Sequence, residues 1–483
     1  MVLGINTSPV LAKEASLEEK SENEAEEADI VGLRKIEDGS IVSNVHTSKW
    51  RVFTDNGREL FMQGKLEEAE RYFFSALQEA KEGFGERDPH VASACNNLAE
   101  LYRVNKAYDK AEPLYLEAID ILEKTFGPED IRVGSAFHNL GQFYLVQRKL
   151  EEAHTCYEIK GRVLGLNHVD YADTMYHLGT VLYLQGKEKD AEVLIQDSIR
   201  ILEEGGQAES IMCVRRLRYL AQMYLRSNRP EEAENVQRKI LHIMELIKGW
   251  NSLDTIIAAE GLALTLQSTG SLKEARELLE RCLDARRTLL PGDHIQIGAN
   301  MLHIARVAML KSSRLRKIDT SKAIAELNKA KDLLKDSIRI SSHILNKVVK
   351  ENGKMLNSGT SGETRKDFHT ALIILLQSLD ALGLLEIKKQ GLQESKDEHS
   401  PIVEAENALL RCISAYKEFG TERSISDSRE VKAEYLSCLM HLSSLMSDSQ
   451  TERTRQFQGV NLQNLQDEIK NLEVEIARRK RRI

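Results

Sequence analysis

Apolar side chains recur along the chain in short stripes that are spaced for one face of an α-helix. Each stripe contains an alanine, and in the clearest cases apolar or small residues follow it four and seven positions later, as Phe73 and Ala76 follow Ala69. This spacing brings side chains to the same side of a helix. The alanines, which we call the marker alanines, are Ala69, Ala111, Ala153, Ala191, Ala233 and Ala275. Their separations are 42, 42, 38, 42 and 42 residues, which predicts a tandem repeat of one structural unit.

A second small residue stands twelve positions before each marker alanine and predicts a second helix in every unit. These small residues are Gly57, Ala99, Gly141, Gly179, Ala221 and Ala263. A glycine or alanine where two helices cross lets their backbones pack closely, and larger neighbours fill the space around the contact. Gly64 is the predicted turn between the two helices, and Gly85 ends the second one. Lys106, Arg148 and Asn228 take the inner-turn position where glycine is missing.

The order small residue, Tyr, turn, Ala, Tyr or Phe, Ala resembles the tetratricopeptide repeat. The segments Asn96–Tyr102 and Ala111–Tyr115 and the 42-residue period are similar to the kinesin-light-chain variety. Its second helix is longer by about two turns than that of the usual 34-residue unit. The resemblance covers Trp50 to about Pro291 and implies an all-α superhelical solenoid, in which the first helices of successive hairpins line a concave groove.

The repeat weakens toward the C-terminus. Ala305 and Ala323 fit a seventh hairpin, and helices over about 365–389 and 401–419 fit a degenerate eighth, after a flexible loop from Asn352 to Gly362. We predict an acidic disordered tail over 1–45, kinesin-light-chain-like repeats over 46–311, degenerate repeats with flexible insertions over 312–419, and C-terminal helices over 426–483.

The last predicted helix carries an apolar seam with 3-4-3-4 spacing, formed by Leu462, Leu465, Ile469, Leu472 and Ile476. Two interpretations stay open. We favour a helix that caps the apolar end of the solenoid, because two heptads alone make a marginal coiled coil. The alternative is a short coiled coil that joins two copies of the chain into a homodimer.

Composition and charge narrow the classes of partner. The formal net charge is −8, which argues against nucleic acid as a partner of the whole chain. The six cysteines are far apart and contain no C-x-x-C pair, so we expect buried thiols in a reducing compartment. The apolar stretch Ala371–Leu385 is interrupted by polar residues, which predicts a buried helix and no membrane span.

The N-terminal residues bear on the compartment. Met1–Ala12 lacks the basic and apolar regions of a signal peptide, so the sequence as written predicts a cytoplasmic protein. Val10-Leu11-Ala12 resembles the end of a cleavable signal. The alternative is therefore an organelle, plastid or mitochondrion, with this start as the remnant of a longer precursor.

The sequence holds none of the enzyme signatures that we sought. The segment Gly359-Thr360-Ser361-Gly362 has no lysine in register for a phosphate loop. The thirteen histidines form no H-x-x-x-H or H-E-x-x-H pair, and a metal site needs three or four convergent ligands. We can nominate no acid–base pair among the carboxylates. We therefore predict a protein that is not an enzyme and has no catalytic residues, cofactor or metal.

The resemblance places function in the groove. Groove-facing positions in tetratricopeptide proteins correspond here to Asn96, Glu100, His138, Gln142, Tyr176, Thr180, Arg215, Arg218, Gln222, Glu260 and Leu264. Arg215 and Arg218 lie one turn apart, which suits a carboxylate on a guest through forked hydrogen bonds. The alternative, that both arginines pair with neighbouring glutamates, stays open.

The predicted function is a scaffold or adaptor that binds a peptide or helix of another protein in the groove. Chaperone C-terminal tails are not expected to bind. Asn97 fits the clamp that such tails require, but Thr54 and Arg58 occupy its first positions and His138 and Gln142 its third.

Two alternative functions remain. One is an RNA-associated or organellar gene-expression factor that uses the basic patches Arg314–Lys317 and Arg478–Arg482. The other is a motor cargo adaptor, which is disfavoured because no heptad region precedes the repeats.

Overall fold

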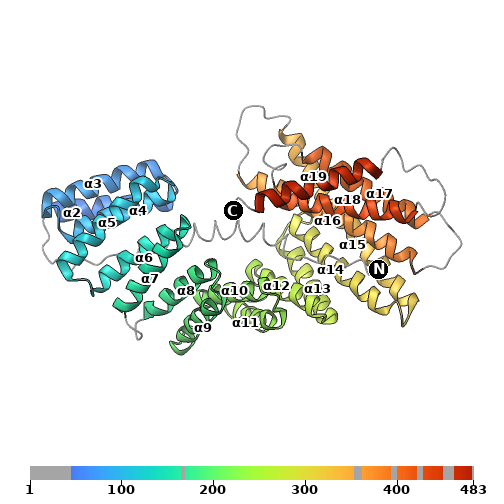
Figure 1. Ribbon diagram of the computed structural model, residues 1–483, viewed down its shortest axis with the longest axis horizontal. Helices are drawn as coiled ribbons and strands as arrows, with labels where there is room; N and C mark the ends of the chain where they lie inside the picture. Colours follow the sequence, from blue (N-terminus) through green and yellow to red (C-terminus); the bar gives the residue numbers. More distant parts are fainter. Residues whose placement is uncertain are drawn as a thin grey trace. The chain divides into compact units, whose positions relative to one another are not determined.

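The computed structural model describes residues 45–164, 169–352, 362–392, 400–420, 428–449 and 462–480, and all secondary structure in these ranges is helical (Figure 1). The all-α prediction is confirmed. The predicted acidic tail apart from its last residue, the loop between Asn352 and Gly362, and Arg481 and Arg482 of the basic cluster lie outside the described residues.

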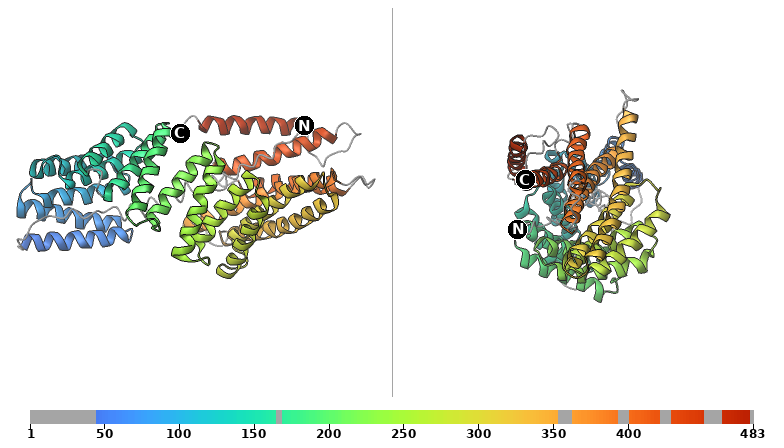
Figure 2. Two further views of the ribbon diagram at one scale, coloured as in Figure 1. Left: turned by 90° about the horizontal axis from the view of Figure 1, so that it is seen from below. Right: turned by 90° about the vertical axis from the view of Figure 1, so that its right-hand side faces the viewer.

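The chain forms two compact units that divide between Met223 and Tyr224, within helix α10. The N-terminal unit holds successive helical hairpins, and neighbouring helices stack one beside the next (Figure 2). Its helices are α2 (Val45–Met62), α3 (Leu66–Phe84), α4 (Pro89–Val104), α5 (Tyr108–Phe126), α6 (Ile131–Val146), α7 (Leu150–Leu164), α8 (Val169–Leu184), α9 (Glu188–Glu204) and α10 (Ile211–Arg226).

The small residues lie where the helices of each hairpin approach most closely. All six marker alanines are fully buried. A methyl group added at Gly57 would lie 2.7 Å from the ring of Phe73, and one added at Gly179 would lie 2.8 Å from Cγ1 of Ile195. Atoms do not approach that closely without displacement. The predicted hairpin crossing is therefore confirmed at these positions.

The inner turns have the same backbone conformation whether or not they contain glycine. Gly64 and Gly186 have φ of 73° and 81°, and Lys106, Arg148 and Asn228 have φ of 59°, 61° and 56°. A non-glycine residue in this left-handed region costs about 1–2 kcal/mol. The tight turn between the helices is therefore maintained even at the cost of local strain.

The C-terminal unit begins with three more repeat helices and ends with longer, less regular ones. Its helices are α11 (Pro230–Lys248), α12 (Leu253–Thr269), α13 (Leu272–Leu289), α14 (Ile295–Leu315), α15 (Thr320–Asn352), α16 (Gly362–Gln390), α17 (Ser400–Phe419), α18 (Arg429–Ser449) and α19 (Leu462–Lys480). Helices α16 and α17 lie where the sequence places the two helices of an eighth hairpin.

Helix α16 is the core element of this unit. It packs against α14, α15, α17 and α18, and residues 371–382 are all buried. Among the described residues, its segment Asp367–Gln390 is long and apolar enough to cross a membrane. However, 83% of the most apolar 18-residue stretch of this segment is buried inside the protein. The core helix of a soluble protein meets the same criterion, and such a helix is what the sequence predicted for this stretch.

The C-terminal seam packs inside the chain. Leu465 is buried in one cluster with Tyr435, Leu439 and Leu442 of α18, and Leu462, Ile469 and Leu472 are partly buried against the same cluster. Helix α19 therefore covers apolar surface of α17 and α18, as a cap does. The coiled coil and the homodimer stay predictions.

The expectation that all six cysteines are free thiols is wrong for two of them. Cys412 of α17 and Cys438 of α18 form a disulfide, with their Cα atoms 6.4 Å apart. They are 26 residues apart in sequence, and only the packing of the two helices brings them together. The other four cysteines are buried and unpaired by disulfides.

Candidate protein-binding site

The predicted groove residues lie on first helices of the hairpins. Asn96 and Glu100 are on α4, His138 and Gln142 on α6, Tyr176 and Thr180 on α8, Arg215, Arg218 and Gln222 on α10, and Glu260 and Leu264 on α12. Glu260 and Leu264 belong to the C-terminal unit, and the others belong to the N-terminal unit. Their surroundings differ, because some side chains bond inside the hairpins and others form one polar cluster.

Both predicted groove carboxylates bond to residues of their own hairpins. Glu100 is 4% exposed, accepts hydrogen bonds from Nε and Nη2 of Arg103 at 3.1 and 2.9 Å, and also accepts one from Tyr115. Glu260 accepts two hydrogen bonds from Arg286 at 2.9 and 2.7 Å. A buried carboxylate requires such compensation. These two side chains therefore stabilise the hairpins themselves.

Four other predicted residues have varied surroundings. Asn96 is buried and accepts a hydrogen bond from the amide of Asn139 on α6 at 2.9 Å. Thr180 donates to the backbone carbonyl of Tyr176, one turn earlier in α8. Gln222 is half-buried, and Leu264 is buried at 6% exposure.

A polar cluster around Asp173 occupies the middle of the N-terminal unit. Oδ2 of Asp173 lies 3.5 Å from Nζ of Lys160, and Oδ1 lies 3.5 Å both from Nη2 of Arg216 and from Nε2 of His177. Nζ of Lys160 lies 2.9 Å from Nδ1 of His138. We call these five residues, from α6, α7, α8 and α10, the Asp173 cluster.

The Asp173 cluster is mostly buried, and its carboxylate is held in the charged form. The side chains of Lys160 and Arg216 are only 1% and 3% exposed, and that of Asp173 is 15% exposed. Burial opposes ionisation of Asp173, but His177, His138 and Lys160 outweigh it and hold its pKa well below the usual value. Burial also lowers the pKa of Arg216, and Asp173 opposes that effect.

Aromatic rings enclose the cluster. Tyr157 of α7 stacks on the ring of His177, with centroids 5.3 Å apart and an interplanar angle of 12°. Tyr176 contacts the edge of His177 and also that of Tyr219 on α10. Burial raises the pKa of Tyr176 to about 12, although Arg215 and Arg216 oppose the shift.

Gln142, which is half-buried, and Arg215, which is exposed, lie between the cluster and the surface. The amide nitrogen of Gln142 lies 3.1 Å from both ring nitrogens of His177. Arg215 is exposed beside the buried Arg216. The structure therefore brings His138, Gln142, Tyr176 and Arg215 of the predicted set into one neighbourhood.

Three residues of the cluster have the donor types of a metal site. The nearest nitrogen and oxygen atoms of His138, Asp173 and His177 all lie within 4.8 Å of one another. A divalent cation between them would also meet Lys160 and Arg216, whose charges lie 3.5 Å from the same carboxylate. Because these two cations already neutralise Asp173, the arrangement suits an anionic guest group better than a metal ion.

Sequence reasoning missed Lys160, Asp173, His177 and Arg216. One signal was present, since Lys160 is the seventh residue after its marker alanine, where the other units have Ala76, Ala118, Ser198, Ile240 and Cys282. A second was the i, i+4 spacing of Asp173 and His177 on one predicted helix. Neither signal could show that four helices meet there.

These features define an all-α repeat protein with a polar cluster on its stacked hairpins, which is the architecture of a protein-interaction scaffold. Models of the tetratricopeptide repeat family match residues 90–158, 172–204 and 210–288. The matched residues are tetratricopeptide repeats, and their 42-residue period resembles that of the kinesin-light-chain variety. Repeats of this family generally form non-catalytic scaffolds for protein–protein interaction.

Several solved structures resemble the chain at low identity. One is a structure of tetratricopeptide-like repeats, nearly identical to one another, of a putative kinesin light chain from Podospora anserina. It is 17% identical to this chain, with a TM-score of 0.31 over 52% of this chain and 100% of that one. BtubC from P. vanneervenii is 16% identical, with a TM-score of 0.31 over 66% and 97% of the two chains. The apo form of RapI is 12% identical, with a TM-score of 0.45 over 85% and 100%. No curated protein sequence matches the chain.

Proposed function

We propose that this protein is a non-enzymatic scaffold that binds a segment of a partner protein along the first helices of its N-terminal hairpins, with an acidic side chain of the guest at Arg215. The observation that carries the proposal is the position of Arg215, which is exposed at the edge of the Asp173 cluster. A guanidinium there can make forked hydrogen bonds to a carboxylate.

The buried part of the cluster supports this role for Arg215. Asp173 is already paired with the buried Arg216. This carboxylate therefore does not compete with a guest carboxylate for Arg215. Tyr176 lies close enough to Arg215 for the arginine to lower its pKa, and its hydroxyl offers a further hydrogen bond to a guest backbone. Arg218 on the same helix is half-buried and extends the basic surface.

The experiment compares the partners of three full-length proteins by proximity labelling. The wild type is compared with the double variant Arg215→Glu, Arg218→Glu and with the control variant Arg200→Glu. Arg200 is on α9 and makes only exposed ion pairs with Asp197 and Glu204, which contribute little to stability. We expect the double variant to lose partners that the wild type and the control retain.

Peptides that tile the lost partners then test the chemistry directly. Fluorescence anisotropy should show binding to the wild type that weakens with rising salt and is lost when one acidic residue of the peptide becomes neutral. Recovery of the same partners by all three proteins would remove the groove assignment. A micromolar complex with a chaperone C-terminal tail would contradict the prediction that such tails do not bind.

For the RNA-associated alternative we find no supporting contact in the described residues. Arg314 donates a hydrogen bond to the backbone carbonyl of Gly270 at 2.7 Å, and Arg316 donates one to that of Gly391 at 3.1 Å. The side chains of the second basic patch lie outside the part of the chain that the structure describes.

A further inference from the structure

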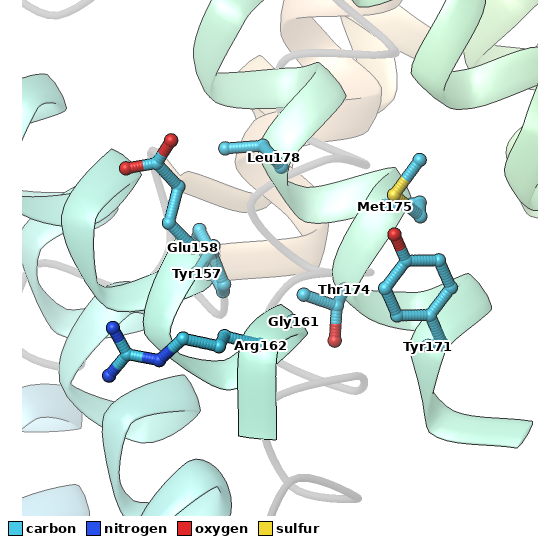
Figure 3. Close-up of a pocket in the computed structure, with 8 residues that line it drawn as sticks. All are labelled: Tyr157, Glu158, Gly161, Arg162, Tyr171, Thr174, Met175 and Leu178. Atoms are coloured by element: carbon cyan, nitrogen blue, oxygen red, sulfur yellow. The ribbon is translucent and has the colours of Figure 1, made fainter. Parts of the chain in front are cut away.

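A pocket opens between α7 and α8, at the junction of two hairpins in the N-terminal unit (Figure 3). Its volume is about 450 Å³, and Tyr157 and Gly161 of α7 face Thr174, Met175 and Leu178 of α8 across it. Tyr157 and Thr174 are at most 1% exposed, so the floor of the pocket reaches the core. Arg215 is not among the residues that line the pocket.

The repeat pattern shows why the pocket exists. The eighth residue after each marker alanine is an aliphatic residue in five of the six units and glycine in the third, giving Leu77, Ile119, Gly161, Ile199, Leu241 and Leu283. Four of the five aliphatic side chains are buried, and Leu241 is partly buried. The third unit therefore differs from the other five, because Gly161 stands where they have an aliphatic residue.

Other junctions show what the aliphatic residue does. Leu283 lies in one apolar cluster with Ile297 and Met301 of the following helix α14. In the repeat register these two residues correspond to Tyr171 and Met175 of α8. Ile119 likewise shares a cluster with residues of α6, the helix that follows it. The aliphatic side chain seals the junction between hairpins, and Gly161 leaves the same space open.

Nothing in the described packing requires a glycine at this position. A methyl group added to Gly161 would lie 3.6 Å from Cγ2 of Thr174 and 3.8 Å from Cε2 of Tyr171, which are ordinary contact distances. Gly161 therefore leaves room beside it for a larger side chain.

We propose that this pocket binds a leucine- or isoleucine-sized aliphatic side chain of a protein partner. The other repeat units show that such a side chain fits this junction, and the walls formed by Met175, Leu178 and the ring of Tyr171 are apolar over most of their surface. The charged ends of Glu158 and Arg162 lie on one side of the pocket, opposite Tyr171 and Met175 (Figure 3). The inference goes beyond the acidic contact at Arg215 and does not depend on it.

The test uses methyl NMR of the full-length protein and two variants of one residue. Gly161→Leu restores the side chain that the other repeats have and should fill the pocket. Gly161→Ala is the matched control, because it gains similar helix propensity and leaves most of the space open. The probe is N-acetyl-leucine methylamide, and N-acetyl-glycine methylamide is the control compound without a side chain.

We expect the leucine probe, at millimolar concentration, to shift the methyl signals of Met175 and Leu178 in the wild type and in Gly161→Ala. The shifts should be absent in Gly161→Leu, whose melting temperature should rise. The double variant Arg215→Glu, Arg218→Glu should keep the shifts. Failure of the groove proposal would therefore be distinguishable from failure of the pocket proposal.

Two results would overturn the pocket proposal. One is a wild-type protein whose Met175 and Leu178 signals do not respond, which would mean that another side chain of the protein already fills the space. The other is an unchanged response in Gly161→Leu. If that variant does not fold, Gly161→Met occupies the same space with a more flexible side chain.

Discussion

The close helix crossing at Gly179 allows a quantitative prediction, because one added methyl group should destabilise the protein there and stabilise it at Gly161. In a helix interior alanine is favoured over glycine by about 1 kcal/mol. At Gly179 the methyl would lie 2.8 Å from Cγ1 of Ile195 and 3.2 Å from the carbonyl oxygen of Ala191.

The two effects at Gly179 have opposite signs. Ile195 is fully buried and branched at Cβ, so it has little freedom to turn away. Overpacking of this kind costs about 1–3 kcal/mol. We therefore expect Gly179→Ala to destabilise its hairpin by about 1 kcal/mol net, whereas Gly161→Ala, with no contact below 3.6 Å, should stabilise its own by about 1 kcal/mol.

Native-state hydrogen exchange is the appropriate assay, because repeat proteins open locally and a single unfolding midpoint averages over the units. Amides of α8 and α9 should exchange about 5-fold faster in Gly179→Ala, and amides of α7 about 5-fold slower in Gly161→Ala, since 1.4 kcal/mol corresponds to a factor of ten. Helices α2 and α3 serve as the internal reference. Equal or greater protection of α8 and α9 in Gly179→Ala would refute the close-packing explanation of the repeat.

Three further predictions concern the C-terminal unit. Burial opposes protonation of His441, but Asp380, 2.7 Å away, outweighs this effect and raises the pKa of His441. The contribution of this pair to stability is therefore fully present below the unfolded pKa of about 6.5 and is lost as the pH rises through the folded pKa. His441→Gln should flatten this pH dependence of the free energy of unfolding in urea. Glu260→Gln should destabilise the unit by about 3–5 kcal/mol in the same assay, because Arg286, 3% exposed, would lose its carboxylate. Leu465→Asp should release α19 from the cluster that Leu465 shares with α18. Hydrogen exchange should then show fast exchange of the amides of residues 462–480, and light scattering should show an unchanged mass. Conversion of a dimer to a monomer would favour the coiled coil instead.

The regular part of the fold was predictable because its determinants are close in sequence. A helical hairpin needs small residues at its crossing and a turn between its helices, and both recur within a few tens of residues. The buried marker alanines and the left-handed Lys106, Arg148 and Asn228 confirm that the period was assigned in the correct register.

The rest depends on contacts that no local pattern records. Helix α16 packs against four other helices, and the Cys412–Cys438 disulfide joins helices whose connection carries no repeat signal. The Asp173 cluster likewise draws its members from four helices, between His138 and Arg216. Helical periodicity shows which face of each helix is buried, but it does not show which charged residues of different helices meet.

The third hairpin offers a physical basis for locating function in a single sequence. Six units solve the same packing problem, so each serves as a control for the others, and only the third has both a lysine at the seventh position and a glycine at the eighth after its marker alanine. Both choices cost stability, since Lys160 is a buried charge and Gly161 forgoes about 1 kcal/mol of helix propensity as well as an apolar contact. The lysine supports the Asp173 cluster and the glycine opens the pocket, and the next marker alanine follows at 38 residues instead of 42. If the glycine took no part in binding, Gly161→Leu would give a more stable protein with unchanged partners.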